Sequence, residues 1–343
     1  MADGRDYEIF EAGDVTLQSG VVFPSLRLAY KTYGTLSPAR DNVILYPTSF
    51  GAQHYDTEWL IERGGALDPD RYFIIIPNLF GNGLSSSPSN ARDVLGEAPF
   101  PAITYHDAIA VQRRLLTEQF GIERVALVYG WSMGGMQAYH WAACCPDMVE
   151  RAAVVCGSAR CSPYNYVFLE SVKAALTADP AFKDGRFVEK PVAGLRAMGR
   201  VYAGWAMSYE FYQGEVWRES GFSSLEDYLA GAWDTAFAHR DGNNLLAQVS
   251  TWQSGDISRC AAFGGDLDRA LASIRARMLL MPGRTDRYFD LRDNEAELGR
   301  LVNAASRELC PIPSIHGHRA GNPMRIPADR AFINRTISAF LQS

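Results

Sequence analysis

Short runs of apolar, largely β-branched residues recur in the first and last parts of this 343-residue chain. Such unbroken runs are typical of strands buried on both faces, as in a parallel sheet covered by helices. Segments of helix-forming composition separate them, and this strand–helix alternation predicts a doubly wound, mostly parallel α/β sheet. The strands are expected at Asn42–Tyr46, Arg71–Ile76, Val125–Tyr129, Ala152–Cys156, Arg277–Met281 and Glu308–Ile312.

Two other patterns complete the expected fold. Alternation around Gly20 and Pro24 predicts an antiparallel hairpin over Val15–Tyr33. Strand–helix alternation stops near Ser158, and the chain is then helical and rich in aromatic residues until it resumes. We therefore expect one core formed by residues 1–158 and 276–343, interrupted by a helical insertion at 159–275. Helices of the core are expected at Thr104–Phe120 with Thr104 as N-cap, from Met136 to about Cys145, at Asn294–Val302 and at Asp329–Leu341.

The pentapeptide Gly130-Trp131-Ser132-Met133-Gly134 lies between a predicted strand and a predicted helix. In that setting G-x-S-x-G is the signature of a nucleophile elbow, a sharp turn that exposes a serine hydroxyl. The serine must take a strained backbone conformation, and side chains at positions 130 and 134 would collide with the neighbouring strand and helix. The alternative interpretation is a glycine-rich turn that only packs.

Composition narrows the choice of function. Hydrophobic residues make up 47% of the chain and charged residues 21%, as in ordinary globular proteins, and the net charge of −6 argues against nucleic acid or an anionic membrane as partner. Six cysteines without C-x-x-C spacing indicate no metal site and suggest reduced thiols in a cytoplasm. The polar N-terminus has no apolar signal core, and Val125–Cys145, although uncharged, is expected to be a buried strand and helix.

No cofactor is predicted. The glycine-rich stretch Asn78–Gly83 resembles a phosphate loop, but it lacks the lysine of a P-loop. It is more typical of a loop in the core near the pocket.

A serine nucleophile needs a base and a carboxylate that orients it, and in α/β-hydrolases these follow the serine in the order acid, then histidine. His318 is the favoured base, because Gly317 supplies a turn after the last strand; His316 is the alternative. Asp286 is the favoured acid, because it follows the strand that ends at Met281. Asp290 is its competitor and suits a helix cap better.

The oxyanion hole is expected to use two backbone N–H groups. One belongs to Met133, the residue after the nucleophile. The other belongs to the loop Pro47–Gly51, where Ser49 is our choice and Phe50 the neighbouring alternative; Pro47 has no N–H to give.

With these residues in place, the chain resembles the homoserine O-acetyltransferase family of the α/β-hydrolase superfamily along nearly its whole length. The resemblance implies an α/β-hydrolase fold with a helical lid insertion, a triad of Ser132, Asp286 and His318, and a homodimer that contacts through the lid. The matching motifs are Ser132–Gln137 with Trp141 and Pro146-Asp147, Phe100–Thr104 with Asp107, Ala178–Pro180, Asp286 with Tyr288-Phe289, and Gly317-His318.

The chain departs from that family where the amino-acid substrate is held. The family carries an Asp after the catalytic His, which holds the ammonium of homoserine; here this residue is Arg319. The family's lid arginine, which pairs with the substrate carboxylate, aligns with Gly199, although a shift of one residue would bring in Arg200. An arginine in place of the carboxylate would repel the ammonium. We expect Trp131, Arg319 and Arg200 to belong to the substrate pocket.

Three hypotheses follow for the function. The first is a serine hydrolase of small carboxylic esters, because a chain without the homoserine contacts resembles the family members that act as carboxylic ester hydrolases. The second is an acetyl-CoA-dependent O-acetyltransferase, which passes the same acyl group to an alcohol. The third, a non-catalytic binding protein, is disfavoured by the complete Ser–Asp–His set.

Overall fold

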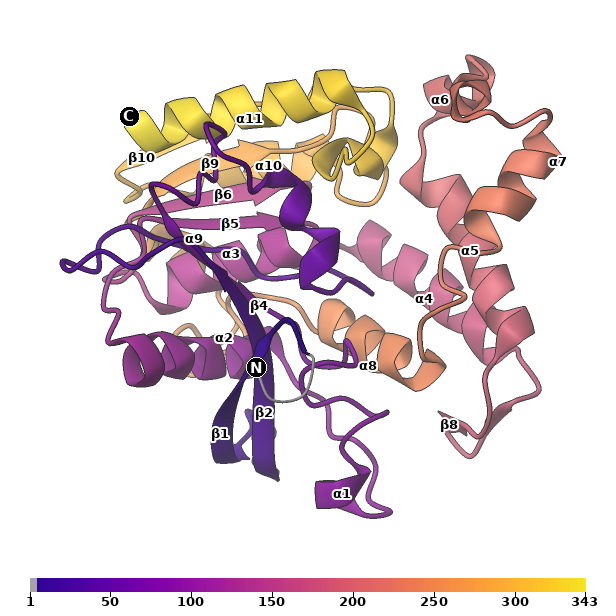
Figure 1. The fold of residues 1–343 in the computed structure, drawn as a ribbon, viewed down its shortest axis with the longest axis horizontal. Helices are drawn as coiled ribbons and strands as arrows, with labels where there is room; N and C mark the ends of the chain where they lie inside the picture. The colour runs from indigo at the N-terminus through magenta and orange to yellow at the C-terminus, as the bar shows by residue number, and fades with distance from the viewer. Residues whose placement is uncertain (1–4) are drawn as a thin grey trace.

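The computed structural model describes residues 5–343, and its centre is an eight-stranded sheet (Figure 1). The strand order is β1-β2-β4-β3-β5-β6-β9-β10. β1 pairs antiparallel with β2, and β2 pairs antiparallel with β4, whereas every later pairing is parallel. The predicted doubly wound α/β sheet is therefore confirmed. The strands are β1 Glu8–Thr16, β2 Val22–Tyr33, β3 Val43–Leu45, β4 Phe73–Pro77, β5 Leu127–Trp131, β6 Arg151–Val155, β9 Arg277–Met281 and β10 Ser306–Leu309.

Each central strand is buried on both faces, because its successive side chains point to opposite faces of the sheet and enter two separate hydrophobic cores. In β4, Phe73 and Ile75 join the core that contains helices α2 and α3, whereas Ile74 and Ile76 join the core beneath α11. Two-sided burial is the physical reason why these strands read as unbroken apolar runs. The helices of the core are α1 Arg92–Leu95, α2 Tyr105–Arg114, α3 Met133–Cys144, α10 Leu291–Leu298 and α11 Pro327–Gln342.

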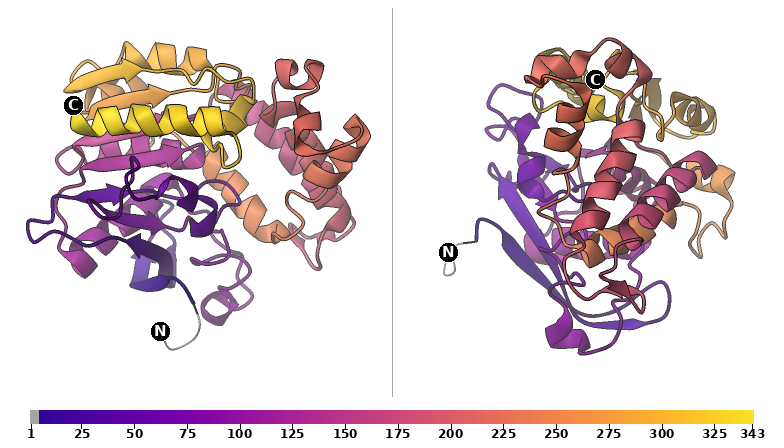
Figure 2. Two further views of the ribbon diagram at one scale, coloured as in Figure 1. Left: turned by 45° about the horizontal axis from the view of Figure 1, so that its top comes forward. Right: turned by 90° about the vertical axis from the view of Figure 1, so that its right-hand side faces the viewer.

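Between β6 and β9 the chain leaves the sheet and forms a largely helical segment (Figures 1 and 2). Its only strands within the described chain are the two-residue pairs β7 Phe182–Lys183 and β8 Arg186–Phe187. The segment therefore has the helical character that the sequence predicts for the insertion, and we call it the insertion; its boundaries at 159 and 275 stay a prediction. Its helices are α4 Pro163–Thr177, α5 Val192–Ala206, α6 Tyr209–Gln213, α7 Leu225–Tyr228, α8 Gly242–Gln253 and α9 Leu267–Ala272.

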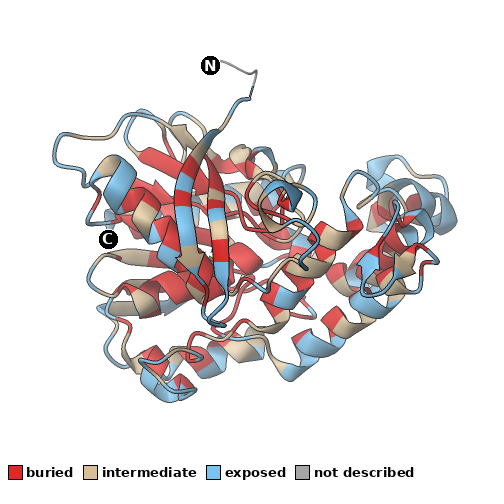
Figure 3. Ribbon diagram, turned by 90° about the horizontal axis from the view of Figure 1, so that it is seen from below, coloured by how far each residue is buried: buried red, intermediate tan, exposed pale blue. Residues whose placement is uncertain are grey.

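Several element boundaries differ from the predicted ones. The first arm of the hairpin begins at Glu8 instead of Val15, because β1 alternates buried and exposed residues and so lacks an apolar run (Figure 3). Helix α10 begins at Leu291, three residues before the predicted start, since Asp290 caps it by accepting the N–H of Arg292. Thr104 caps α2 as expected: its hydroxyl accepts the N–H of Asp107.

Among residues 5–343, no helix is long and apolar enough to cross a membrane. The uncharged stretch Val125–Cys145 forms β5 and α3, as expected. All six cysteines are free.

A buried carboxyl connects the start of the insertion to the core. Glu297 on α10 is 5% exposed, and it accepts the N–H of Ala159 at 2.8 Å and the side-chain amide of Asn294 at 2.9 Å. Burial raises the pKa of Glu297 from its ordinary 4.5 to about 7, because it penalises the charged form more than these donors favour it. The folded protein therefore binds this proton more tightly than the unfolded chain does.

We predict that the substitution Glu297→Gln changes the pH dependence of stability. The proton contributes stability that is fully present below about pH 4.5 and is lost as the pH rises through about 7. A neutral amide has no such loss, so the melting temperature of the variant minus that of the wild type should increase between about pH 5 and about pH 8. Thermal melts at both pH values measure this, and an identical difference at both would contradict it.

Candidate active site

The elbow between β5 and α3 places Ser132 in a strained backbone conformation, with φ 58° and ψ −124°. Its two flanking glycines are required by close backbone contacts. A Cβ on Gly130 would lie 2.0 Å from the carbonyl oxygen of Gly134, and a Cβ on Gly134 would lie 2.7 Å from that of Pro47. The collisions expected from the sequence are therefore present, and they bring the loop after β3 against the start of α3.

Asp286 and His318 form a buried hydrogen bond. His318 Nδ1 lies 2.6 Å from Asp286 Oδ2, and the side chains are 4% and 0% exposed, respectively. The other carboxylate oxygen of Asp286 accepts the N–H groups of Tyr288 and Phe289, both at 3.2 Å. A carboxylate held in this way accepts the Nδ1 proton of the imidazole, so Nε2 is left as the basic nitrogen.

Aromatic rings fix the position of His318. Its ring centroid lies 5.0 Å from that of Trp131, 4.4 Å from that of Tyr288 and 5.5 Å from that of Phe289. Gly317 makes the turn before it with φ 57°, and a Cβ there would lie 2.4 Å from the carbonyl oxygen of Ala206 in the insertion. The turn attributed to Gly317 is therefore used, and it also needs glycine for space.

The competing residues lie elsewhere. His316 Nδ1 lies 3.2 Å from Ser314 Oγ and 3.6 Å from a carboxylate oxygen of Asp329. Asp290 is the N-cap of α10. Neither residue lines the cavity that contains Ser132.

Ser132 and His318 line one cavity of about 220 Å³ at the carboxyl ends of the parallel strands. Within residues 5–343 the Ser132 hydroxyl forms no hydrogen bond. In ligand-free enzymes the bond between the serine and its base is often long and tightens only when substrate binds, so its absence here is compatible with a serine–histidine pair. The insertion supplies much of the wall through Tyr202, Ala206, Trp233, Ala236, Phe237, His239, Arg240 and Trp252.

Three unpaired backbone N–H groups belong to residues that either line this cavity or directly follow Ser132. Ser49 and Phe50 line it, and Met133 is the first residue of α3, where helix N–H groups lack partners. In the described chain none of these three N–H groups donates a hydrogen bond. They are therefore available to a developing oxyanion.

Of the three residues that the sequence assigns to the substrate pocket, the structure places two at the cavity and one away from it. Trp131 and Arg319 line the cavity, and Arg319 forms no ion pair with any described residue. Arg200 is not brought to the cavity: its guanidinium binds Asp234 at 2.5 Å and Glu226 at 3.2 Å.

Gly199, the residue aligned with the family's lid arginine, also cannot carry a long side chain in this backbone. A Cβ at that position would lie 2.0 Å from the carbonyl oxygen of Trp233. No arginine therefore enters the cavity from this turn of α5.

Other residues of the cavity were not found from the sequence. Arg240 lines it and forms an ion pair with Asp56 at 2.8 Å, and Tyr202 and Trp252 come from different helices of the insertion. Their sequence separation leaves no motif that would have identified them.

One cluster near the site has the residue types of a metal centre. Possible ligand atoms of Cys156, Asp286 and His318 all lie within 4.8 Å of one another. However, the 2.6 Å between His318 Nδ1 and Asp286 Oδ2 is a hydrogen-bond distance. Two ligands of a tetrahedral ion with bonds of about 2.0 Å lie roughly 3.3 Å apart, so the pair as it stands does not fit an ion.

Comparisons with known proteins identify the fold family of the chain. Residues 51–308 match the model of the alpha/beta hydrolase fold family. The chain is 38% identical over 315 residues to an ethyl acetate hydrolase of Pseudomonas veronii, covering 91% of this chain and 89% of that protein. An acetylester hydrolase from Corynebacterium glutamicum superposes with a TM-score of 0.92 at 36% identity, covering 98% of this chain and 96% of that one.

Acyltransferases are also similar to this chain. A homoserine O-succinyltransferase of Methylibium petroleiphilum is 32% identical over 336 residues, covering 89% of this chain and 86% of that protein. The similarity therefore extends to both esterases and homoserine acyltransferases, with higher identity to the esterase.

Proposed function

The chain belongs to the alpha/beta hydrolase fold family, and from this premise we propose that it hydrolyses small carboxylic esters through an acyl-enzyme on Ser132. One observation carries the proposal: the buried pair of Asp286 and His318 meets the strained Ser132 at a cavity with free backbone N–H groups. A glycine-rich turn that only packs against its neighbours would need none of these features.

In the proposed mechanism, His318 Nε2 takes the proton of the Ser132 hydroxyl as its oxygen attacks the ester carbonyl carbon. Asp286 stabilises the imidazolium that forms. The carbonyl oxygen becomes an oxyanion, which accepts hydrogen bonds from the N–H groups of Met133 and of Ser49 or its neighbour Phe50. When the C–O bond breaks, His318 gives the proton to the departing alcohol.

The acyl-enzyme is then attacked by water, which His318 deprotonates in the same way. When the bond between the acyl carbon and the Ser132 oxygen breaks, His318 returns this proton to the serine and the carboxylic acid leaves. A transferase would instead hold an alcohol in the cavity and keep water from reacting. For homoserine this needs an anion for the ammonium and a cation for the carboxylate. Arg319 stands where the anion is expected, and the close contact at Gly199 leaves no room for a cationic side chain at the position where the family carries its lid arginine. These features support hydrolysis over transfer to homoserine.

Two further proposals concern the setting of the enzyme. Free cysteines suit a reducing compartment, which supports a cytoplasmic location. The insertion exposes several large apolar residues, which supports a homodimer formed through it. These residues include Tyr164, Tyr166, Val167, Val192 and Tyr209.

We predict that Ser132, Asp286 and His318 act as one unit. Ser132→Ala should lower kcat for an acetate ester by a factor on the order of 10⁴ or more, and adding His318→Ala should cost little further. His316→Ala is the matched control, because this ring is oriented by Ser314 outside the cavity; it should retain most of the activity. If instead the His316 variant is inactive and the His318 variant active, the base has been assigned to the wrong histidine.

We also predict that water is the acyl acceptor. With acetyl-CoA and L-homoserine, the enzyme should release little free thiol and form little or no O-acetylhomoserine, and homoserine should not accelerate turnover of simple acetate esters. The physical reason is that Arg319 repels the ammonium that an acceptor site must hold. Thiol release and product formation are followed together; O-acetylhomoserine formed faster than any tested ester is hydrolysed would falsify the hydrolase assignment.

A further inference from the structure

Helix α3 contacts the loop after β3 through a buried side-chain amide. Gln137 Nε2 donates to the carbonyl oxygen of Thr48 at 3.0 Å and is also 3.4 Å from that of Met133. Gln137 and Thr48 are both 0% exposed. The triad does not use this contact, although Gln137 belongs to the motif that follows the nucleophile.

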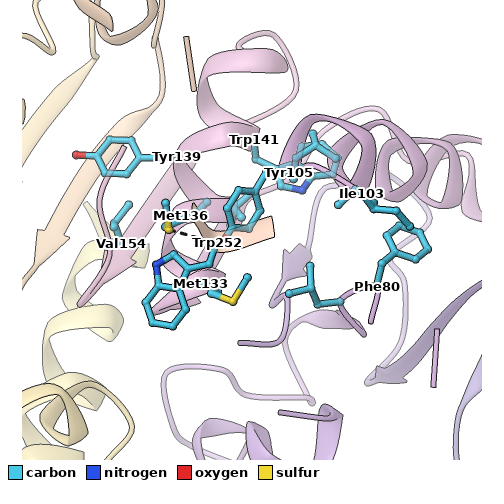
Figure 4. Packing of buried hydrophobic residues seen from close by; sticks show 14 of the residues in the cluster. Phe80, Ile103, Tyr105, Met133, Met136, Tyr139, Trp141, Val154 and Trp252 are labelled. Atoms are coloured by element: carbon cyan, nitrogen blue, oxygen red, sulfur yellow. Dashed lines mark hydrogen bonds between the residues drawn. The ribbon is translucent and has the colours of Figure 1, made fainter. Parts of the chain in front are cut away.

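The orientation of the Gln137 amide is set by two further buried side chains. The indole N–H of Trp141 can only donate, and it lies 2.8 Å from Gln112 Oε1. The NH₂ group of Gln112 must then face the other way, and it donates to Gln137 Oε1 at 2.8 Å. Gln137 is left with its NH₂ group towards Thr48. Figure 4 shows Trp141 packed among the buried rings around α3.

The Thr48 carbonyl shares a peptide group with the N–H of Ser49. Peptide bonds in residues 5–343 contain no cis form, so this C=O and this N–H point in opposite directions. Two more bonds hold the same residue: Thr48 N–H donates to the Pro77 carbonyl at 3.2 Å, and Thr48 Oγ1 accepts the N–H of Leu79 at 2.8 Å. When the Thr48 carbonyl is held pointing towards Gln137, the Ser49 N–H is held pointing away from Gln137. Ser49 lines the same cavity as Ser132.

The same helix also orients the other candidate donor. The carbonyl of Ser132 accepts the N–H of Met136 at 3.0 Å, and that carbonyl shares its peptide group with the N–H of Met133. Helix α3 therefore orients the Met133 N–H through its own backbone and the Ser49 N–H through the Gln137 side chain.

We propose that Gln137 is a positioning residue of the oxyanion hole: it aims the Ser49 N–H by holding the Thr48 carbonyl, and Gln112 and Trp141 set its amide orientation. This inference rests on the proposed ester hydrolysis, and it assigns the second oxyanion donor to Ser49 over Phe50. Gln137 itself touches no substrate.

The test compares an oxygen ester with the matching thionoester, in which sulfur replaces the carbonyl oxygen. Sulfur is the weaker hydrogen-bond acceptor, so the ratio of the two kcat/KM values measures how well the oxyanion donors are placed. In Gln137→Met the amide is lost at similar volume. Removing an oxyanion donor outright costs on the order of 10²–10³ in kcat. For the misplaced donor we expect a fall of about 10- to 100-fold with KM nearly unchanged, and a fall of about tenfold in the ester-to-thionoester ratio.

The matched control is Gln248→Met. Gln248 is 1% exposed and accepts the N–H of Gly51 at 2.7 Å, so it holds the same loop without touching the Thr48–Ser49 peptide. Its loss should leave the ester-to-thionoester ratio within about twofold of the wild type, since no proposed donor is reoriented. An equal fall of the ratio in both variants would overturn the proposal.

If a thermal melt shows that Gln137→Met folds poorly, a second variant tests the same proposal. Trp141→Phe removes only the indole N–H that orients Gln112, at the far end of this chain of hydrogen bonds. It should also lower the ester-to-thionoester ratio, by a smaller factor. A folded Gln137 variant with the wild-type ester-to-thionoester ratio would contradict the inference without affecting the proposed ester hydrolysis. If the wild-type protein cleaves no ester, the proposed function itself is contradicted.

Discussion

The close approach of helix α3 to the loop after β3 is the constraint on which the site depends. The backbone of Gly134 lies so near the Pro47 carbonyl that a side chain cannot be inserted, and Gly130 lies even closer to the carbonyl of Gly134. This contact brings the nucleophile, the helix N-terminus and the loop with Ser49 to one point. It also places a buried amide of the helix within hydrogen-bond distance of that loop. A single packing contact thus positions the serine and both proposed oxyanion donors.

The sheet supplies the rest of the triad from a different direction. Asp286 follows β9 and His318 follows β10, and parallel strands present these loops at the same edge as the elbow after β5. Burial strengthens the hydrogen bond between the two side chains, because little water competes for it. The insertion then covers this edge with aromatic rings, so the chemistry is proposed to take place in a small, largely apolar cavity with Arg319 at its wall.

What the sequence could predict follows from the range of the interactions involved. The central strands were found because burial on both faces leaves only apolar residues, and the elbow because its glycines are local requirements. The start of β1 was missed, since a strand with one exposed face in this stretch lacks an apolar run. Arg200 was assigned to the pocket, but the carboxylates that bind it come from positions 226 and 234, which no local pattern connects to it. The role inferred for Gln137 likewise needed the distance to Thr48, across 89 residues of sequence.

The most direct test of the central claim is to trap the acyl-enzyme. The enzyme is mixed with an acetate ester that has a good leaving group, quenched in acid during turnover, digested and analysed by mass spectrometry. The proposed mechanism predicts one acetyl group on the peptide that contains Ser132, and none on that peptide in Ser132→Ala. Rapid ester hydrolysis with the acetyl group on another residue, or undiminished hydrolysis by Ser132→Ala, would contradict it.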